Sequence, residues 1–152
     1  MTKDEEFMKL ALHQASVASM IDEVPIGCVI VRNGEVIAKA YNKRINLIDP
    51  TAHAEIIALR QAARVVGNWQ LADCELYVTI EPCMMCAGAI IQSRIKRVVF
   101  GALEPKGGAF GSSINALDAK NINHRPEIVS GVLEEECAEI IRSYFKNKRK
   151  VK

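Results

Sequence analysis

Near the middle of the chain, the five residues Leu76-Tyr77-Val78-Thr79-Ile80 are almost all apolar or β-branched. A strand with one face in water alternates apolar and polar residues, whereas a strand covered on both faces is a nearly continuous apolar run. This segment therefore predicts a strand inside a sheet that helices cover on both sides.

A hairpin is predicted upstream of this strand. Residues 26–32 and 35–41 are rich in β-branched and apolar side chains, and Asn33-Gly34 joins the two runs. A two-residue hairpin turn needs positive φ at both positions, which Asn and Gly adopt readily. We therefore expect two antiparallel strands joined by a tight turn.

Two helices are predicted on either side of the apolar strand. Asp49-Pro50-Thr51 is typical of the start of one helix, and Gly67 can end it. Pro82 fits the first position of the next helix, which is expected to reach about Ser93.

Both ends of the chain are also predicted to be helical. The capping-box spacing of Thr2 and Glu5 marks the start of the first helix. Further strands are expected over residues 96–100 and 127–132. The inner face of the last helix is marked by Leu133, Cys137, Ile140, Ile141, Tyr144 and Phe145. Because strands alternate with helices after the hairpin, the sequence predicts an α/β protein with a mixed sheet between two helical layers.

A single domain over residues 1–152 suits a chain of 152 residues, of which 49% are hydrophobic and 25% charged. The chain has no run of about 18 apolar residues, so no membrane span is expected. Its first six residues are mostly charged and do not resemble a signal segment, which predicts a cytoplasmic protein.

Cys83 and Cys86 are the first candidates for metal ligands, because residues three apart share a face of a helix. The start of a helix favours the thiolate over the thiol, and the thiolate is the form that binds zinc. His53 can supply a third ligand through a neutral imidazole. Three protein ligands leave the fourth tetrahedral position open, so that zinc can hold water there and lower its pKa toward about 7.

Glu55 is the candidate general acid–base. Zinc held by two thiolates and one imidazole carries no net charge, so a base beside it should help catalysis. Residues i and i+2 of an ideal helix point about 200° apart, so Glu55 should not bind the same metal as His53. It could still lie beside a metal placed off the end of the helix.

Two other interpretations of the cysteine pair are open. Cys-x-x-Cys also forms redox pairs and halves of structural zinc sites. A structural site needs a fourth ligand, for which the candidates are His13, His124, Cys28, Cys74 and Cys137. The combination of His-x-Glu with Pro-Cys-x-x-Cys favours catalysis, and the three other cysteines lie in apolar contexts that are typical of buried residues.

The C-terminal segment 142–152 carries six basic residues and no acidic one. Such a segment is either a solvated helix end or a contact for the phosphates of a nucleic acid.

The paired motifs resemble the zinc deaminases of cytidine, deoxycytidylate, guanine and tRNA adenosine, which carry a His-x-Glu and Pro-Cys-x-x-Cys signature. Longer segments resemble the bacterial tRNA-specific adenosine deaminases, over roughly residues 20 to 131. These segments are Val24-Pro25-Ile26-Gly27, Pro50-Thr51-Ala52-His53-Ala54-Glu55, Leu76 to Cys83, Cys86-Ala87-Gly88-Ala89, Ser93-Arg94-Ile95, Val98-Val99-Phe100-Gly101-Ala102 and Asn123-His124-Arg125.

The resemblance implies a cytidine-deaminase-like α/β/α fold with a five-stranded mixed sheet, assembled as a homodimer. It implies hydrolysis of the wobble adenosine of a tRNA anticodon to inosine. One Zn²⁺ per subunit would be held by His53, Cys83 and Cys86. A hydroxide on the zinc would attack C6 of adenine while Glu55 shuttles protons.

The resemblance also implies contacts with the substrate. Asn42 matches a residue that contacts the purine, although it could equally be a turn residue that closes the hairpin. Contacts with RNA are implied for Glu104, Lys106, Asn123, Phe145 and Arg149. Glu104 stands where the family usually has aspartate, Lys106 could be a solvated loop residue, and Phe145 could simply pack in the core.

Two alternative functions follow from the same residues. A deaminase of a free base or nucleoside, such as guanine, cytosine or cytidine, would use the same zinc site. A non-catalytic, zinc-stabilised RNA-binding module would use the zinc only for folding, but such a module has no use for Glu55.

Overall fold

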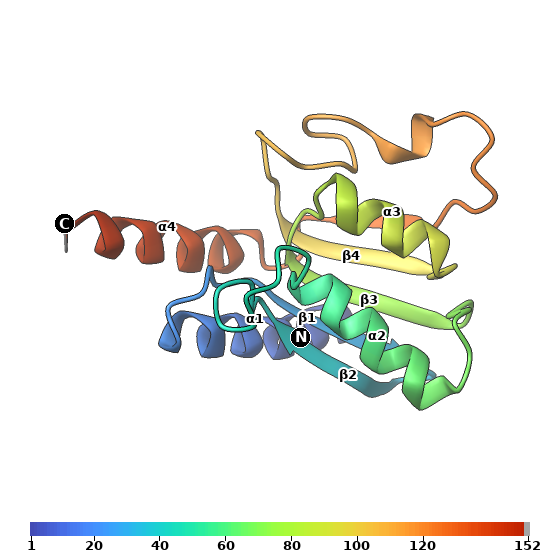
Figure 1. Cartoon of the computed structure of the whole chain (residues 1–152), viewed down its shortest axis with the longest axis horizontal. Helices are drawn as coiled ribbons and strands as arrows, with labels where there is room; N and C mark the ends of the chain where they lie inside the picture. Colours follow the sequence, from blue (N-terminus) through green and yellow to red (C-terminus); the bar gives the residue numbers. More distant parts are fainter. Residues whose placement is uncertain (151–152) are drawn as a thin grey trace.

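The computed structural model describes residues 1–150, and a five-stranded sheet in the order β2-β1-β3-β4-β5 forms its centre (Figure 1). The strands are β1 Gly27–Arg32, β2 Glu35–Tyr41, β3 Cys74–Ile80, β4 Arg97–Ala102 and β5 Glu127–Ser130. β1 runs antiparallel to β2 and β3, whereas β3, β4 and β5 are parallel. The predicted mixed five-stranded sheet is confirmed.

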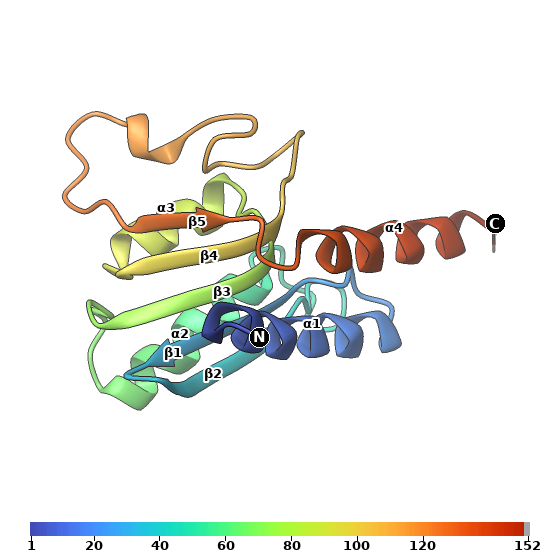
Figure 2. The same ribbon diagram turned by 180° about the vertical axis from the view of Figure 1, so that it is seen from behind.

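Helices cover both faces of the sheet, which gives the three-layer arrangement that the sequence predicts. The α2 helix Ala54–Val66 and the α3 helix Met84–Gln92 lie on the face toward the viewer in Figure 1. The α1 helix Lys3–Met20 and the α4 helix Glu134–Lys150 lie on the other face, which Figure 2 shows. None of the helices in residues 1–150 combines the length and the apolar run needed to cross a membrane.

The central strands are buried on both faces. In β1, Cys28 and Ile30 pack in the cluster under α2 and α3, whereas Val29 and Val31 pack in the cluster under α1 and α4. Tyr77 of β3 belongs to the second cluster, while its neighbours in the strand belong to the first. Because each face has its own apolar layer, the nearly continuous apolar composition of these strands follows.

Three local predictions are confirmed. The Thr2 hydroxyl accepts a hydrogen bond from the Glu5 amide, and the Glu5 carboxylate accepts one from the Thr2 amide. Asn33 and Gly34 have φ values of 52° and 80° in the hairpin turn, and Gly67 ends α2 at a φ of 76°.

Two helices begin later than predicted. The Asp49 carboxylate accepts hydrogen bonds from the amide and hydroxyl of Thr51, which makes a local turn there, and α2 begins at Ala54 after the N-cap His53. Pro82 lies just before the N-cap Cys83 rather than in the first turn of α3. These shifts place a ligand candidate directly at the start of each helix.

The last predicted strand is also shorter than expected. β5 ends at Ser130 because the chain turns at Gly131 and Leu133, whose φ values are 85° and 52°. Of the basic C-terminal segment, Lys152 and the side chain of Lys150 lie outside the described part.

Candidate metal and catalytic site

The three candidate metal ligands meet where α2 and α3 begin. His53 is the N-cap of α2, Cys83 is the N-cap of α3, and Cys86 lies in the first turn of α3. β3 ends at Ile80, so the site lies at the carboxyl end of a strand in the parallel part of the sheet. The N-termini of two helices, which favour negative charge, therefore face the same point.

The geometry of these donors fits one zinc ion. The His53 Nδ1 atom lies 3.6 Å from Cys83 Sγ and 3.4 Å from Cys86 Sγ, and all three donor atoms lie within 4.8 Å of one another. Tetrahedral zinc with bonds of about 2.3 Å to sulfur and about 2.0 Å to nitrogen separates these atoms by about 3.5 Å. Both the spacing and the N/S donor set are those that zinc prefers.

The other candidate ligands are placed elsewhere. Cys28, Cys74 and Cys137 are buried in the two apolar clusters, and His13 is exposed on α1, on the opposite face of the sheet. The His124 Nε2 atom is hydrogen-bonded to the Ile95 carbonyl oxygen at 2.6 Å. Within residues 1–150 the donor group consists of three side chains, as in catalytic zinc sites that keep an open position.

The environment of the two thiols favours a partly ionised ligand set. Hydrogen bonding from the Cys86 thiol lowers the pKa of Cys83 well below its usual range; burial opposes this shift, and His53 adds to it. The same hydrogen bond, followed by burial, raises the pKa of Cys86. One sulfur of the pair is thus readily a thiolate, which is the form that a cation recruits.

Glu55 lies in the first turn of α2, and its side chain is buried beside Cys86. Burial raises the pKa of Glu55 to about 7. Its Oε1 atom has no hydrogen-bond partner within residues 1–150. A buried polar atom without a partner is costly, so this oxygen suits a site that a bound group completes.

The expected opposition of His53 and Glu55 does not apply in the structure. His53 has extended backbone, with φ −72° and ψ 152°, so it precedes the helix and is not subject to the 200° helical separation. His53 and Glu55 therefore both reach the space in front of the first turn of α2, where His53 contacts Cys83 and Cys86.

Asn42 follows β2 and is buried next to the same helix start. Its Oδ1 atom accepts a hydrogen bond of 3.2 Å from the Ala54 amide, the first amide of α2. Its own amide donates to the Ile26 carbonyl oxygen at 3.2 Å. Asn42 thus holds the N-terminus of α2, one residue after His53, against the edge of the hairpin.

Glu81 was not identified by the sequence analysis. Its buried carboxylate accepts hydrogen bonds from the amides of Glu104, Phe110 and Ser112 at 3.0 to 3.1 Å, and from the Ser112 hydroxyl. Burial raises the pKa of Glu81, but these hydrogen bonds outweigh it and lower the pKa overall. The carboxylate therefore fixes the loop after β4 beside Cys83.

Gly108 makes this arrangement possible. A Cβ atom at Gly108 would lie 2.4 Å from Glu81 Oε1 and 2.5 Å from the Glu104 carbonyl oxygen. Gly108 also pairs with Cys83 in an isolated β-bridge. We call the contact of the Glu81 carboxylate with the loop after β4 the Glu81 clamp. The sequence contains one clue to it, because Glu81 is a single acid between an apolar strand and Pro82.

Glu23 is a second buried carboxylate that the sequence analysis missed. Its Oε2 atom accepts hydrogen bonds from the backbone amide and side-chain amide of Asn46, at 2.7 and 2.8 Å. This contact fixes the loop between β2 and α2, which connects Asn42 to His53.

The implied RNA contacts lie on segments outside the donor group. Lys106 and Asn123 are exposed in the connection between β4 and β5, and Arg149 is exposed on α4. The Glu104 carboxylate accepts a hydrogen bond of 2.9 Å from the Lys106 amide, so it folds back on its own loop. The Phe145 side chain is 40% exposed, and therefore is not a core residue.

Comparisons with known proteins agree on one family. Residues 2–149 match the family model of the MafB19-like deaminases. A Bacillus subtilis (strain 168) protein named tRNA-specific adenosine deaminase is 49% identical over 152 residues, which cover 100% of this chain and 94% of that protein.

Solved structures share the fold as well. A structure from a study of A-to-I editing by tRNA:A34 deaminases at the wobble position superposes with a TM-score of 0.87 at 47% identity, covering 89% of this chain and 98% of the other. A guanine deaminase from Bacillus subtilis has a TM-score of 0.63 at 35% identity, covering 76% of this chain and 85% of the other. The same fold thus carries deaminases of different purines.

Proposed function

The chain belongs to the MafB19-like deaminase family and, within it, to the tRNA-specific adenosine deaminases, and on this premise we propose that it converts the wobble adenosine of a tRNA anticodon to inosine by hydrolysis. The observation that carries the proposal is the meeting of His53, Cys83 and Cys86 at two helix N-termini, with the buried Glu55 beside them. A tRNA substrate would be met in the cytoplasm, which is the compartment we propose.

The proposed metal is zinc, held by His53 Nδ1 and by the sulfur atoms of Cys83 and Cys86. When bound, zinc would supply an activated water by lowering the pKa of a water molecule at its open position.

Glu55 would move the protons of the reaction. Its buried carboxylate, with the pKa raised to about 7, can both accept and donate a proton near neutral pH. We propose that it accepts one proton from the attacking water and gives it to N1 of adenine, then accepts the remaining proton of the hydroxyl on C6 and gives it to the leaving amine. The carbon–nitrogen bond at C6 breaks, ammonia leaves, and oxygen takes its place.

The purine must leave any helical stack to reach this site. A nucleotide in an anticodon loop is already nearly free of that cost. We propose that the Asn42 amide contacts the purine from the end of β2, while its oxygen holds the first amide of α2.

Contacts with the rest of the RNA are proposed around the site. Lys106 and Arg149 carry exposed positive charge that can meet phosphates, and Asn123 is exposed for a polar contact. The exposed ring of Phe145 can stack on a base. The Glu104 carboxylate can contact RNA only if its hydrogen bond with the Lys106 amide breaks.

A homodimer is proposed as the assembly. The side of the molecule formed by α2 and α3 exposes Trp69, Met84 and Met85 and contains a groove of about 370 Å³ that Trp69 also lines. An apolar groove and large exposed apolar side chains on one side of a protein favour an association surface there. Substituting Met84 with Lys should lower the sedimentation coefficient from the dimer to the monomer value, and an unchanged value would place the contact elsewhere.

Guanine deaminase activity is the second candidate, because a solved guanine deaminase shares the fold. A truncation that removes residues 146–152 separates the two activities. It removes Arg149, so inosine formation in an anticodon stem-loop should fall and become less sensitive to salt, whereas a deaminase of free guanine should be unaffected. Guanine turnover without inosine formation would overturn the tRNA assignment. The non-catalytic alternative is disfavoured because the family consists of enzymes.

A further inference from the structure

The second half of α4 extends past the ends of the strands, beside the end of α1 (Figures 1 and 2). The first turns of α4 are anchored by the buried Cys137, which packs so closely on β4 that a Cβ atom at Gly101 would lie 2.3 Å from its sulfur. Residues 145–149 are exposed. The core therefore holds the start of α4, and its exposed second half depends on the rigidity of the helix and on contacts outside the core.

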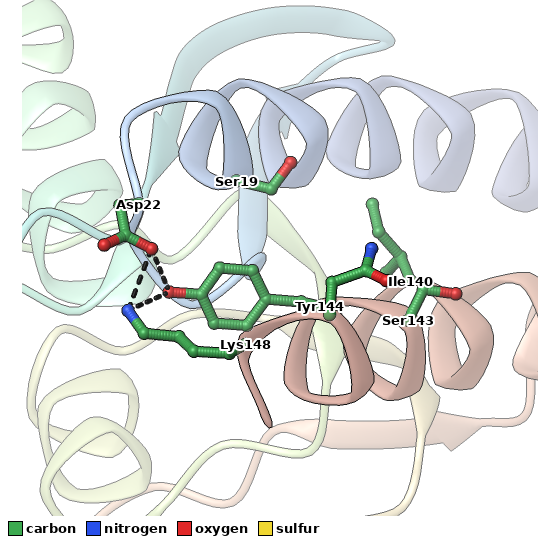
Figure 3. Close-up of a pocket in the computed structure, with 7 residues that line it drawn as sticks. Ser19, Asp22, Ile140, Ser143, Tyr144 and Lys148 are labelled. Atoms are coloured by element: carbon green, nitrogen blue, oxygen red, sulfur yellow. Dashed lines mark hydrogen bonds and ion pairs between the residues drawn. The ribbon is translucent and has the colours of Figure 1, made fainter. Parts of the chain in front are cut away.

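Asp22 makes such a contact from the turn after α1 (Figure 3). Its Oδ1 atom accepts hydrogen bonds from the Tyr144 hydroxyl at 3.0 Å and from Lys148 Nζ at 2.8 Å. Lys148 Nζ also donates to the Tyr144 hydroxyl at 3.3 Å. We call these three residues the clasp.

The backbone presents Asp22 in a fixed direction. Its φ of 60° lies in the left-handed region, which aspartate tolerates better than most residues. The amides on both sides of it, those of Ile21 and Glu23, donate to the Ala18 carbonyl oxygen at 3.1 and 2.9 Å. Asp22 is therefore held by the end of α1 rather than by α4.

The clasp lies at one end of a groove of about 580 Å³ between α1 and α4, which Ser19 and Ile140 also line (Figure 3). Because side chains do not fill this space, the two helices are not tightly packed there. The clasp spans the groove and ties the outer part of α4 to the rest of the protein.

The clasp residues adjoin the RNA contacts proposed on α4. The Tyr144 ring packs edge-to-face on Phe145 with 5.3 Å between ring centroids, and Lys148 directly precedes Arg149. We propose that Asp22 is a positioning residue, which orients Phe145 and Arg149 toward RNA through Tyr144 and Lys148. This inference rests on the tRNA substrate proposed above.

The sign of the effect separates this role from plain electrostatics. A carboxylate near bound phosphates repels them, so removing its charge would ordinarily strengthen RNA binding. If Asp22 is a positioning residue, its carboxylate instead strengthens RNA binding, and replacing the carboxylate weakens RNA binding. Exposed ion pairs have modest energies, so the expected loss of affinity is about two- to fivefold.

The test uses the full chain loaded with zinc and an anticodon stem-loop bearing a wobble adenosine. Kd is measured by fluorescence anisotropy in the Glu55→Gln background, which prevents turnover, and kcat and KM in the otherwise native chain. The variants are Asp22→Asn, Tyr144→Phe and the pair together. Glu35→Gln is the matched control, because it removes an exposed carboxylate at the hairpin turn. Hydrogen exchange of residues 142–149 is followed without RNA.

We expect Asp22→Asn and Tyr144→Phe each to raise Kd and KM about two- to fivefold, and kcat to stay within about twofold. The double variant should raise Kd by no more than the product of the two single effects, because both residues act through the same contact. Amides of α4 should exchange faster in each variant. Tighter RNA binding by Asp22→Asn, matching Glu35→Gln, would overturn the inference. Faster exchange together with a native chain that neither binds nor converts the stem-loop would instead overturn the proposed function and leave the clasp standing.

Discussion

The Nδ1 atom of His53 lies 3.4 Å from the Sγ atom of Cys86, although 33 residues separate them in the chain. Substituting Cys86 with Ser should therefore reduce bound zinc to a small fraction of the native content, as measured by atomic absorption after dialysis. Cys74→Ala is the control, because Cys74 is buried in the core outside the donor group. Native zinc content in Cys86→Ser would contradict the assigned ligand set.

The Glu81 clamp predicts opposite outcomes for two neighbouring glycines. Gly108→Ala forces a Cβ atom to within 2.4 Å of the Glu81 carboxylate, whereas a Cβ atom at Gly107 would lie 4.0 Å from its nearest neighbour. We expect Gly108→Ala to lower the free energy of unfolding by about 1–3 kcal/mol and to speed proteolysis of the loop after β4. Gly107→Ala should behave like the native protein in both measurements, and equal effects at the two positions would contradict the clamp.

Asn42→Ala tests whether its side chain does more than hold α2. Losing an acceptor at a helix N-terminus costs about 1 kcal/mol, so chemical denaturation should show a loss of that size in a protein that stays folded. A contact with the purine would add a fall in kcat/KM of about tenfold or more. Asn68→Ala is the control. It removes an exposed side-chain oxygen that accepts a hydrogen bond from the Gln70 amide, and it should leave kcat/KM unchanged. A fall in stability alone would reduce Asn42 to a structural residue.

Asp4 and Arg97 predict a pH-dependent contribution to stability. The two side chains form two hydrogen bonds of 2.9 and 2.7 Å, which join α1 to β4, and the Arg97 guanidinium lowers the pKa of Asp4. Because the folded pKa lies below the unfolded value, the stabilisation is complete above about pH 4 and is lost as the pH falls through the lowered pKa. Asp4→Asn should cost about 2 kcal/mol at neutral pH and progressively less below pH 4.

The matched control for this pair is Asp73→Asn. Asp73 forms an exposed ion pair with Arg32, with side chains 49% and 39% exposed, and such pairs contribute little to stability at any pH. Thermal unfolding of both variants across pH 3 to 8 measures the difference. A cost for Asp4→Asn that stays constant with pH would contradict the account of the Asp4 carboxylate.

Local sequence patterns predicted the elements that depend on neighbouring residues. The apolar run in β3, the Asn33-Gly34 turn and the capping box of Thr2 and Glu5 all encode their structure within a few residues. The start of α2 was misplaced because Asp49 and Thr51 form a side-chain turn, which has the same residue types as a helix cap.

Distant contacts could not be predicted in the same way. Glu81 meets Ser112 across 31 residues, and Glu23 meets Asn46 across 23, so nothing in the local spacing identifies either buried carboxylate. The three donors could be named from their types and spacing, but their approach within 4.8 Å depends on the fold that places two helix starts together. The hydrogen bond between Asp22 and Tyr144 joins residues 122 apart in the chain, so it likewise depends on tertiary structure alone.

The most direct test of the central claim compares the native chain with Glu55→Gln on an anticodon stem-loop bearing a wobble adenosine, with inosine measured by mass spectrometry and zinc measured in the same samples. The account predicts rapid inosine formation by the native chain and a loss of about 10²-fold or more in Glu55→Gln, at equal zinc content. Inosine formation by Glu55→Gln at the native rate would contradict the role of Glu55 as the group that moves protons.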